Sequence, residues 1–266
     1  MNHLLRSLAP ISDRTWELLD AEARERLTPA LAARKLVDFS GPLGWEYSAT
    51  NLGRVSDPTG SPAEGVDVRR RKVLPVIELR ADFTLSAAEL RDADRGADDV
   101  DLEPLDRAAH QIAVAENVAV LDGAEGAISG IAEATTNDTI ALGEAPERYP
   151  QHVASAVYRL LSSGVAGPYA LALGPDVYTK VVQTSEQGGY PLLEHLRKFI
   201  DGPIVWAPGL AGAVVISQRG GDFTFHSGQD LSIGYDSHDR DGVHLYLEES
   251  FSFHVATPEA AVVLGR

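Results

Sequence analysis

The chain has 266 residues, 44% hydrophobic and 23% charged, a composition typical of a globular protein with one sizeable core or two smaller ones. Its 39 acidic and 23 basic residues give a formal net charge of −16, which excludes nucleic acid as a main ligand because phosphate binding needs a basic face. The absence of cysteine excludes disulfides, thiolate metal sites and cysteine nucleophiles.

The N-terminal segment gives no sign of export. It lacks the apolar core of a signal peptide, and no stretch of the chain approaches the roughly 18 apolar residues of a membrane helix. We therefore expect a cytoplasmic protein that does not enter a membrane.

The first predicted element is a helix over residues 13–27. Trp16, Leu19, Ala23 and Leu27 share one face at helical spacing. Thr28-Pro29 can end this helix or restart it, since Pro is tolerated in a first turn. The residues 34–39 then predict a short strand, closed by a turn-rich stretch over residues 40–44.

A long hairpin is predicted over residues 45–85. Its tip, residues 56–65, is rich in turn-forming residues, and residues 77–85 alternate apolar and polar side chains as a half-buried strand does. The outer part has few apolar residues, and a two-stranded ribbon that cannot cover itself is marginally stable in water. We expect it to lie on another part of the protein or on a neighbouring chain, with the basic run 69–72 as a solvated strand face or a subunit contact.

The remaining chain alternates helices and strands and then becomes mostly strand. Ser86 and Glu89 predict a helix start, and a longer helix is expected over residues 103–121. Helices and strands alternate over residues 130–221, and the chain after residue 222 is strand and turn. The pattern predicts a mixed α/β protein.

No catalytic motif is present. The sequence contains no nucleophile elbow, phosphate-binding loop, dinucleotide fingerprint or zinc-binding helix. Glu249 lies on the apolar face of a strand that begins near Val243, which predicts a bulge or a buried partner for its carboxyl group.

The stretch SHDRDGVHLYLE (residues 237–248) matches the spelling of a calcium loop at five positions. A calcium loop needs flanking helices and must curl back to its twelfth residue. Here, alternating strand patterns lie on both sides of Asp241-Gly242, which predicts a β-hairpin with its turn at these two residues.

As a whole, the sequence resembles the encapsulins, also called the linocin or bacteriocin-like family, over essentially its full length. The stretches that carry the resemblance are residues 8–11, 33–38, 41–47, 83–85, 167–169, 189–191, 219–223, 228–235 and 249–253. The resemblance implies the fold of tailed-bacteriophage major capsid proteins and self-assembly into an icosahedral nanocompartment.

That fold divides the chain into three parts. The resemblance implies a discontinuous peripheral domain (residues 1–44, 81–130 and 223–266), an extended loop (45–80) and an axial domain (131–222). The last segment is expected to return to the peripheral sheet. The loop agrees with the independent prediction that the hairpin needs a neighbour.

Family members enclose cargo enzymes such as dye-decolorising peroxidases or ferritin-like proteins, which carry a C-terminal targeting peptide. Carried onto this chain, the peptide-binding candidates are Arg34, Asp38, Leu231 and Ile233, unless these residues only pack the first helix against the sheet. The pore at the fivefold axis corresponds to the loop formed by Ser185, Glu186, Gln187, Gly188, Gly189 and Tyr190, which a flexible surface loop would fit equally well. Some relatives bind flavin, but no cofactor or metal is predicted for this chain.

The resulting hypothesis is a structural shell subunit without enzymatic activity. One alternative is a secreted bacteriocin- or protease-like protein, against which the missing signal peptide and nucleophile count. The other is a ligand-binding module built on residues 237–248. The sequence leaves open the cargo, the number of subunits and the selectivity of the pore.

Overall fold

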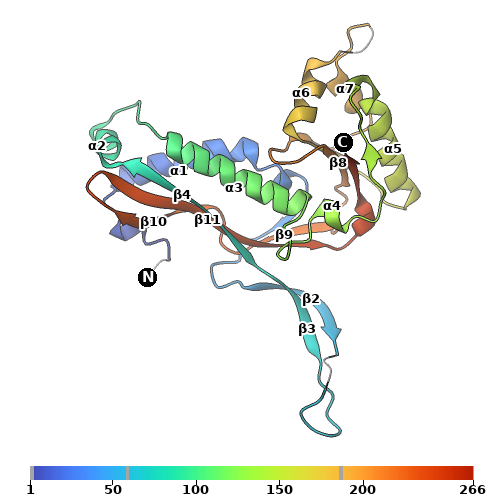
Figure 1. Ribbon diagram of the computed structural model, residues 1–266, viewed down its shortest axis with the longest axis horizontal. Helices are drawn as coiled ribbons and strands as arrows, with labels where there is room; N and C mark the ends of the chain where they lie inside the picture. Colours follow the sequence, from blue (N-terminus) through green and yellow to red (C-terminus); the bar gives the residue numbers. More distant parts are fainter. Residues whose placement is uncertain (1–2, 58–59, 186–187, 266) are drawn as a thin grey trace.

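The computed structural model describes residues 3–57, 60–185 and 188–265, which form two lobes and a projecting arm (Figure 1). Each lobe is built on a five-stranded sheet, and the long helix α3 (Glu103–Leu121) extends from the first lobe toward the second. None of the helices in these residue ranges combines the length and apolar character needed to cross a membrane.

Strand β11 (Gly242–Val255) is the central strand of the first sheet. Its first half lies between β10 (Ser232–His238) and β4 (Ile77–Ser86), and its second half pairs with β9 (Phe223–Ser227). These pairings are antiparallel, whereas β1 (Asp38–Ser40) joins the outer edge of β9 in parallel. Neighbours on both sides bury β11 nearly throughout its length.

Helices cover one face of this sheet. Helix α3 packs on β4, and α1 (Asp13–Ala30) lies beside α3, while the short α2 (Ala87–Arg95) lies at the far end of the lobe (Figure 1). The helix expected over residues 13–27 is confirmed, with the predicted apolar stripe buried. It begins at Ser12, whose hydroxyl oxygen accepts the Thr15 N–H, and it continues through Pro29 in its last turn.

The segment after α1 is a turn where a strand was expected. A 3-10 turn, η2 (Ala33–Lys35), precedes β1, so the prediction of a strand over residues 34–39 is wrong for residues 34–37. The buried side chain of Asn117 causes the difference, because its oxygen accepts the N–H groups of Ala32 and Ala33 at 2.9 and 3.0 Å. These bonds hold the chain in a turn against α3.

The second lobe has strand order β5-β12-β8-β6-β7. Its strands are β5 (Ile140–Ala141), β6 (Tyr169–Leu173), β7 (Ile204–Trp206), β8 (Ala213–Ser217) and β12 (Ala261–Gly265). Its helices are α4 (Ile131–Ala134), α5 (Tyr149–Ser162), α6 (Pro175–Gln183) and α7 (Leu192–Leu196). Further 3-10 turns are η1 (Arg6–Leu8), η3 (Pro146–Arg148) and η4 (Pro258–Ala260).

The C-terminal strand corrects one expectation. Residues 223–266 were expected to return to the first sheet, but η4 redirects the chain after β11 and β12 pairs with β8 and β5 in the second sheet. The reason is its apolar run, in which Ala261, Val262 and Leu264 are fully buried. Such a run suits a strand that lies between two neighbours with both faces covered.

The arm consists of β2 (Ala49–Ser56) and β3 (Arg70–Pro75), which pair with each other and project away from both lobes (Figure 1). Val55 is 53% exposed and Val73 is 46% exposed, and every residue of the basic run 69–72 is exposed. The predicted hairpin is therefore confirmed for β2 and β3, whereas residues 77–85, expected in its second arm, form β4 and pair with β11 in the first sheet. Within this subunit the outer part of the hairpin lies uncovered.

The stretch that resembles a calcium loop is the tip of the β10–β11 hairpin. Asp239 N–H donates to the Gly242 carbonyl, so the two turn residues are Arg240 and Asp241, one position earlier than predicted. The Asp239 side chain closes the turn by accepting the N–H groups of Asp241 and Gly242, both at 2.8 Å. The carboxylate thus serves the turn itself. Across the described parts of the chain, no three His, Asp or Glu side chains gather as a metal site.

Candidate functional site

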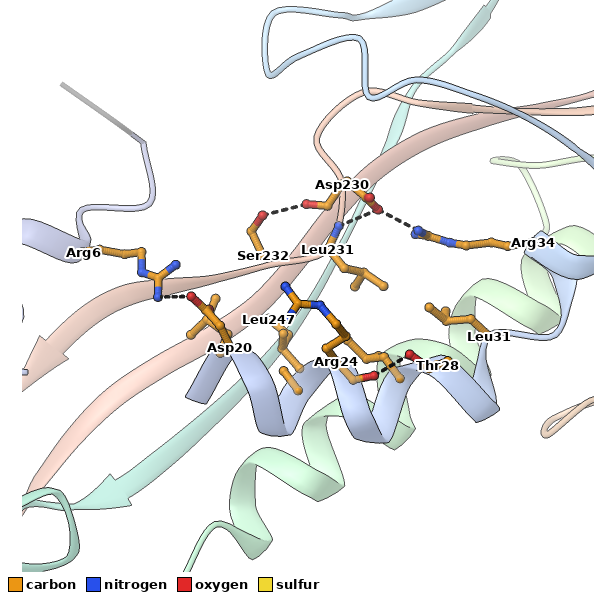
Figure 2. Close-up of a pocket in the computed structure, with 13 residues that line it drawn as sticks. Arg6, Asp20, Arg24, Thr28, Leu31, Arg34, Asp230, Leu231, Ser232 and Leu247 are labelled. Atoms are coloured by element: carbon orange, nitrogen blue, oxygen red, sulfur yellow. Dashed lines mark hydrogen bonds and ion pairs between the residues drawn. The ribbon is translucent and has the colours of Figure 1, made fainter. Parts of the chain in front are cut away.

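A groove with a cavity volume of about 390 Å³ runs between helix α1 and strand β10 on the first lobe (Figure 2). Its floor is apolar and its rim is charged. The floor consists of Ala23, Leu27, Leu31, Leu231, Ile233 and Leu247. The charged residues of the rim are Arg6, Asp20, Arg24, Arg34 and Asp230. We call this feature the α1–β10 groove.

The floor of the groove is lined by apolar side chains from one face of α1 and from the chain at β10. Ala23 and Leu27 are four residues apart on α1 and face inward, while Ile233 of β10 and Leu231, just before that strand, are two residues apart and both line the groove. Ile233 is buried, with 1% exposed, and Leu231 is half-buried. Because helix and strand do not close completely over these side chains, a hollow remains with an apolar base.

Arg34 forms one end of the groove and is tied into a buried ionic cluster. Its guanidinium donates from Nε to Glu116 Oε2 at 2.6 Å, from Nη1 to Asp230 Oδ1 at 2.6 Å and from Nη2 to Glu249 Oε2 at 2.7 Å. Glu116 is fully buried on α3, and Glu249 is 2% exposed on β11. The expected buried partner of Glu249 is therefore confirmed, and it is Arg34.

The two buried carboxyl groups oppose each other's ionisation. The Oε1 atoms of Glu116 and Glu249 are buried and have no hydrogen-bond partner among the described residues. Two carboxylates held beside one guanidinium repel each other, which disfavours the ionisation of both. Burial and the neighbouring charge of Glu116 raise the pKa of Glu249 well above its ordinary value, which favours its protonated form.

The charge of Arg34 is stabilised in the same cluster. Burial alone would lower the pKa of its guanidinium, but the charges of Glu116, Glu249 and Asp230 outweigh that effect and raise this pKa. Burial likewise raises the pKa of Glu116, although the positive charge of Arg34 opposes the shift. A single cation thus holds together α3, β11 and the turn before β10.

The structure brings three of the four predicted peptide-binding residues together. Arg34, Leu231 and Ile233 line the α1–β10 groove, whereas Asp38 does not. Asp38 lies at the start of β1, where its Oδ2 accepts the Gly221 N–H at 2.6 Å and so holds the turn before β9. Its part in peptide binding stays a prediction.

The predicted pore loop projects from the second lobe between α6 and α7 (Figure 1). Ser185 pairs with Pro191 at its base, and Gly188 and Gly189 have positive φ angles of 99° and 80°. Tyr190 is 41% exposed, with the Lys198 ammonium 4.7 Å from its ring centre. Glu186 and Gln187 lie outside the described residues.

Sequence reasoning missed most of the rim and the far side of the floor. Arg6, Asp20 and Arg24 carry no motif, and Leu31 and Leu247 come from segments more than two hundred residues apart. The apolar period of α1 was the available signal, because it showed which face of the helix is buried. It gave no indication of the strand that lies opposite.

The chain matches a known protein family over most of its length. Residues 1–252 match the family described as "encapsulating protein for peroxidase". The type 1 encapsulin shell protein of Rhodospirillum rubrum is 49% identical over 99% of this chain and 96% of its own length. That of Mycobacterium tuberculosis is 42% identical over the full length of both chains.

Solved structures share the fold at low sequence identity. A virus-like particle from Pyrococcus furiosus superposes with a TM-score of 0.67 at 20% identity, covering 94% of this chain and 98% of the other. The Mycobacterium phage Bobi structure gives a TM-score of 0.58 at 14% identity, covering 89% and 90%. The two lobes and the arm are therefore the architecture of a tailed-phage capsid protein, as the sequence resemblance implied.

Proposed function

Because the chain belongs to the family of type 1 encapsulin shell proteins, we propose that its copies enclose a cargo enzyme whose C-terminal peptide binds in the α1–β10 groove. The chain is a shell subunit with a capsid-like fold, and its relatives are structural proteins and not enzymes. The family description names a peroxidase as the enclosed protein, and we propose a dye-decolorising peroxidase or a ferritin-like protein as cargo here.

The α1–β10 groove is the observation that carries the cargo proposal. It has the apolar base and polar edge that bind an extended peptide, because apolar side chains gain from burial and the polar rim fixes their register. Leu31 and Leu231 are only half-buried in the isolated subunit, so an apolar peptide side chain would complete their burial.

The arm supports assembly into a closed, icosahedral shell. Its exposed valines and basic strand are left without cover in the single subunit, and a neighbouring subunit would cover them.

We assign residues 1–44, 81–130 and 223 to the end of β11 to a peripheral domain. The arm, 45–80, is the extended loop, and 131–222 with β12 form the axial domain. The loop of residues 185–190 would line a pore, and the particle would reside in the cytoplasm.

Size-exclusion chromatography and negative-stain microscopy test the shell. We expect uniform hollow particles of megadalton mass, and a monomer or small oligomer under mild conditions would contradict assembly. Co-expression with a peroxidase or ferritin-like protein, with and without its C-terminal segment, tests loading. Only the cargo that keeps this segment should co-purify with the particles.

Leu231→Gln tests the groove itself. It removes apolar surface from the floor without introducing a charge, so particles should form and carry less cargo. The matched control is Val182→Gln, which changes an exposed apolar residue of α6, on the second lobe away from the groove. Equal loading of both variants would contradict peptide binding in the groove.

A further inference from the structure

Arg24 is the arginine of the groove rim that has no ionic partner among the described residues. Three arginines line the α1–β10 groove, and two of them are occupied. Arg34 donates to three carboxyl groups, and Arg6 lies 2.8 Å from Asp20 Oδ2 with its guanidinium 4.0 Å from the centre of the Trp16 ring. Arg24 is exposed and forms no ion pair with any residue that the structure describes.

The position of Arg6 explains why Arg24 is available. Asp20 lies one helical turn before Arg24, the spacing at which an Asp and an Arg on a helix ordinarily pair. Arg6, from the turn η1, instead binds the Asp20 carboxylate across the end of the groove. In Figure 2 the guanidinium of Arg24 extends from α1 into the space in front of β10, between the Arg6–Asp20 pair and the Asp230–Arg34 pair.

The charges around the groove favour an anion at this point. Arg6 is paired with Asp20, and Arg34 is paired with Asp230 and the buried Glu116, which leaves the charge of Arg24 uncompensated in a chain of net charge −16. An acidic group is therefore repelled by most of the surface and attracted to Arg24. A guanidinium binds a carboxylate through two parallel hydrogen bonds, which fixes both position and orientation.

Resting on the proposed peptide-binding function, we propose that Arg24 binds a carboxylate of the cargo peptide and so selects peptides that combine apolar side chains with one acidic group. The apolar side chains occupy the floor at Leu27, Leu231 and Ile233, and the carboxylate meets Arg24 at the rim. The carboxylate is either an Asp or Glu side chain or the free α-carboxylate at the peptide's C-terminus.

The test is the loading of a fluorescent protein fused to the cargo's C-terminal segment, co-expressed at sub-saturating level and quantified as fluorescence per particle. Arg24→Glu should lower loading by about tenfold, which equals about 1.4 kcal/mol. Arg24→Gln should give a smaller loss. The matched control is Arg14→Glu, an exposed arginine of the same helix that does not line the groove and should leave loading unchanged.

Two changes to the probe identify the carboxylate. If replacing the acidic residues of the segment by their amides removes the difference between Arg24 and Arg24→Gln, a side chain is the ligand. If a short Gly-Ser extension at the C-terminus removes it, the α-carboxylate is the ligand. A lysine in place of the acidic residue should restore loading of Arg24→Glu particles.

Equal loading of intact Arg24→Glu and unsubstituted particles would overturn the assignment of Arg24 and leave peptide binding in the groove standing. Loss of loading in Arg14→Glu to the same extent would also overturn it, because the effect would then reflect overall charge. Failure of the unsubstituted shell to load the probe would overturn the proposed function itself.

Discussion

The raised pKa of Glu249 predicts how stability changes with pH. Native Glu249 ionises at a higher pH than 4.5, the ordinary pKa that it regains on unfolding. Unfolding above that pH therefore releases a proton. The stabilising contribution of this group is fully present below pH 4.5 and is lost as the pH rises toward the native pKa. The loss amounts to about 1.4 kcal/mol for each pH unit in that window.

Glu249→Gln should remove this dependence. The amide is uncharged at every pH, and its oxygen can accept from Arg34 as the carboxyl oxygen does. Above the ordinary pKa, the free energy of unfolding of the variant minus that of the unsubstituted protein should therefore rise by about 1.4 kcal/mol per pH unit. The gain stops where native Glu249 ionises.

The measurement is guanidinium-induced unfolding followed by tryptophan fluorescence, from about pH 5 to about pH 9. All samples need equal subunit concentration, because assembly contributes to apparent stability. Glu125→Gln, the same chemical change at an exposed position, is the control. Its free energy of unfolding should depend on pH in the same way as that of the unsubstituted protein. If the stability of Glu249→Gln shows the same pH dependence as that of the unsubstituted protein, the pKa of native Glu249 is not raised.

Arg34→Met tests the cation of the same cluster. The substitution leaves Glu116 and Glu249 buried without their positive partner, which typically costs about 3–5 kcal/mol. Reduced cargo loading of such a variant would not separate peptide binding from folding. A loss below about 1 kcal/mol would show that the pair is not held by Arg34 in solution.

Two further substitutions test the turn after α1 and the arm. Asn117→Ala leaves the buried Ala33 N–H and Pro208 carbonyl without a partner and should lower the free energy of unfolding by at least about 2 kcal/mol, since each unmet group costs about 1–3 kcal/mol. Gln111→Ala, on the exposed face of the same helix, should change it by less than about 0.5 kcal/mol, and equal losses would contradict the role of Asn117. Reversing the charges of Arg70 and Arg71 to Glu should leave the subunit folded and impair particle formation in size-exclusion chromatography, while replacing both with Lys should not. Normal assembly of the Glu variant would show that the basic strand makes no subunit contact.

The sequence by itself determined most of the elements and the buried face of the first helix. The apolar period of residues 13–27 and the turn signals near Asp241 follow from local geometry and are present in the structure. The alternation along β11 predicted a strand, but both of its faces are buried. The resemblance of short stretches in a fixed order supplied the capsid-like fold. Glu249 was recognised as out of place because its face of the strand is apolar.

Only the tertiary structure decided what lies opposite each face. Arg34 is separated from Glu116 by 82 residues and from Glu249 by 215, and no local pattern relates them. The turn at Ala33 depends on Asn117, the last strand joins the second sheet, and Asp38 supports a turn away from the groove. The apolar period of a helix or strand shows which of its faces is buried. Which segment covers that face depends on packing between distant parts of the chain. The α1–β10 groove and its available Arg24 exist only at that level.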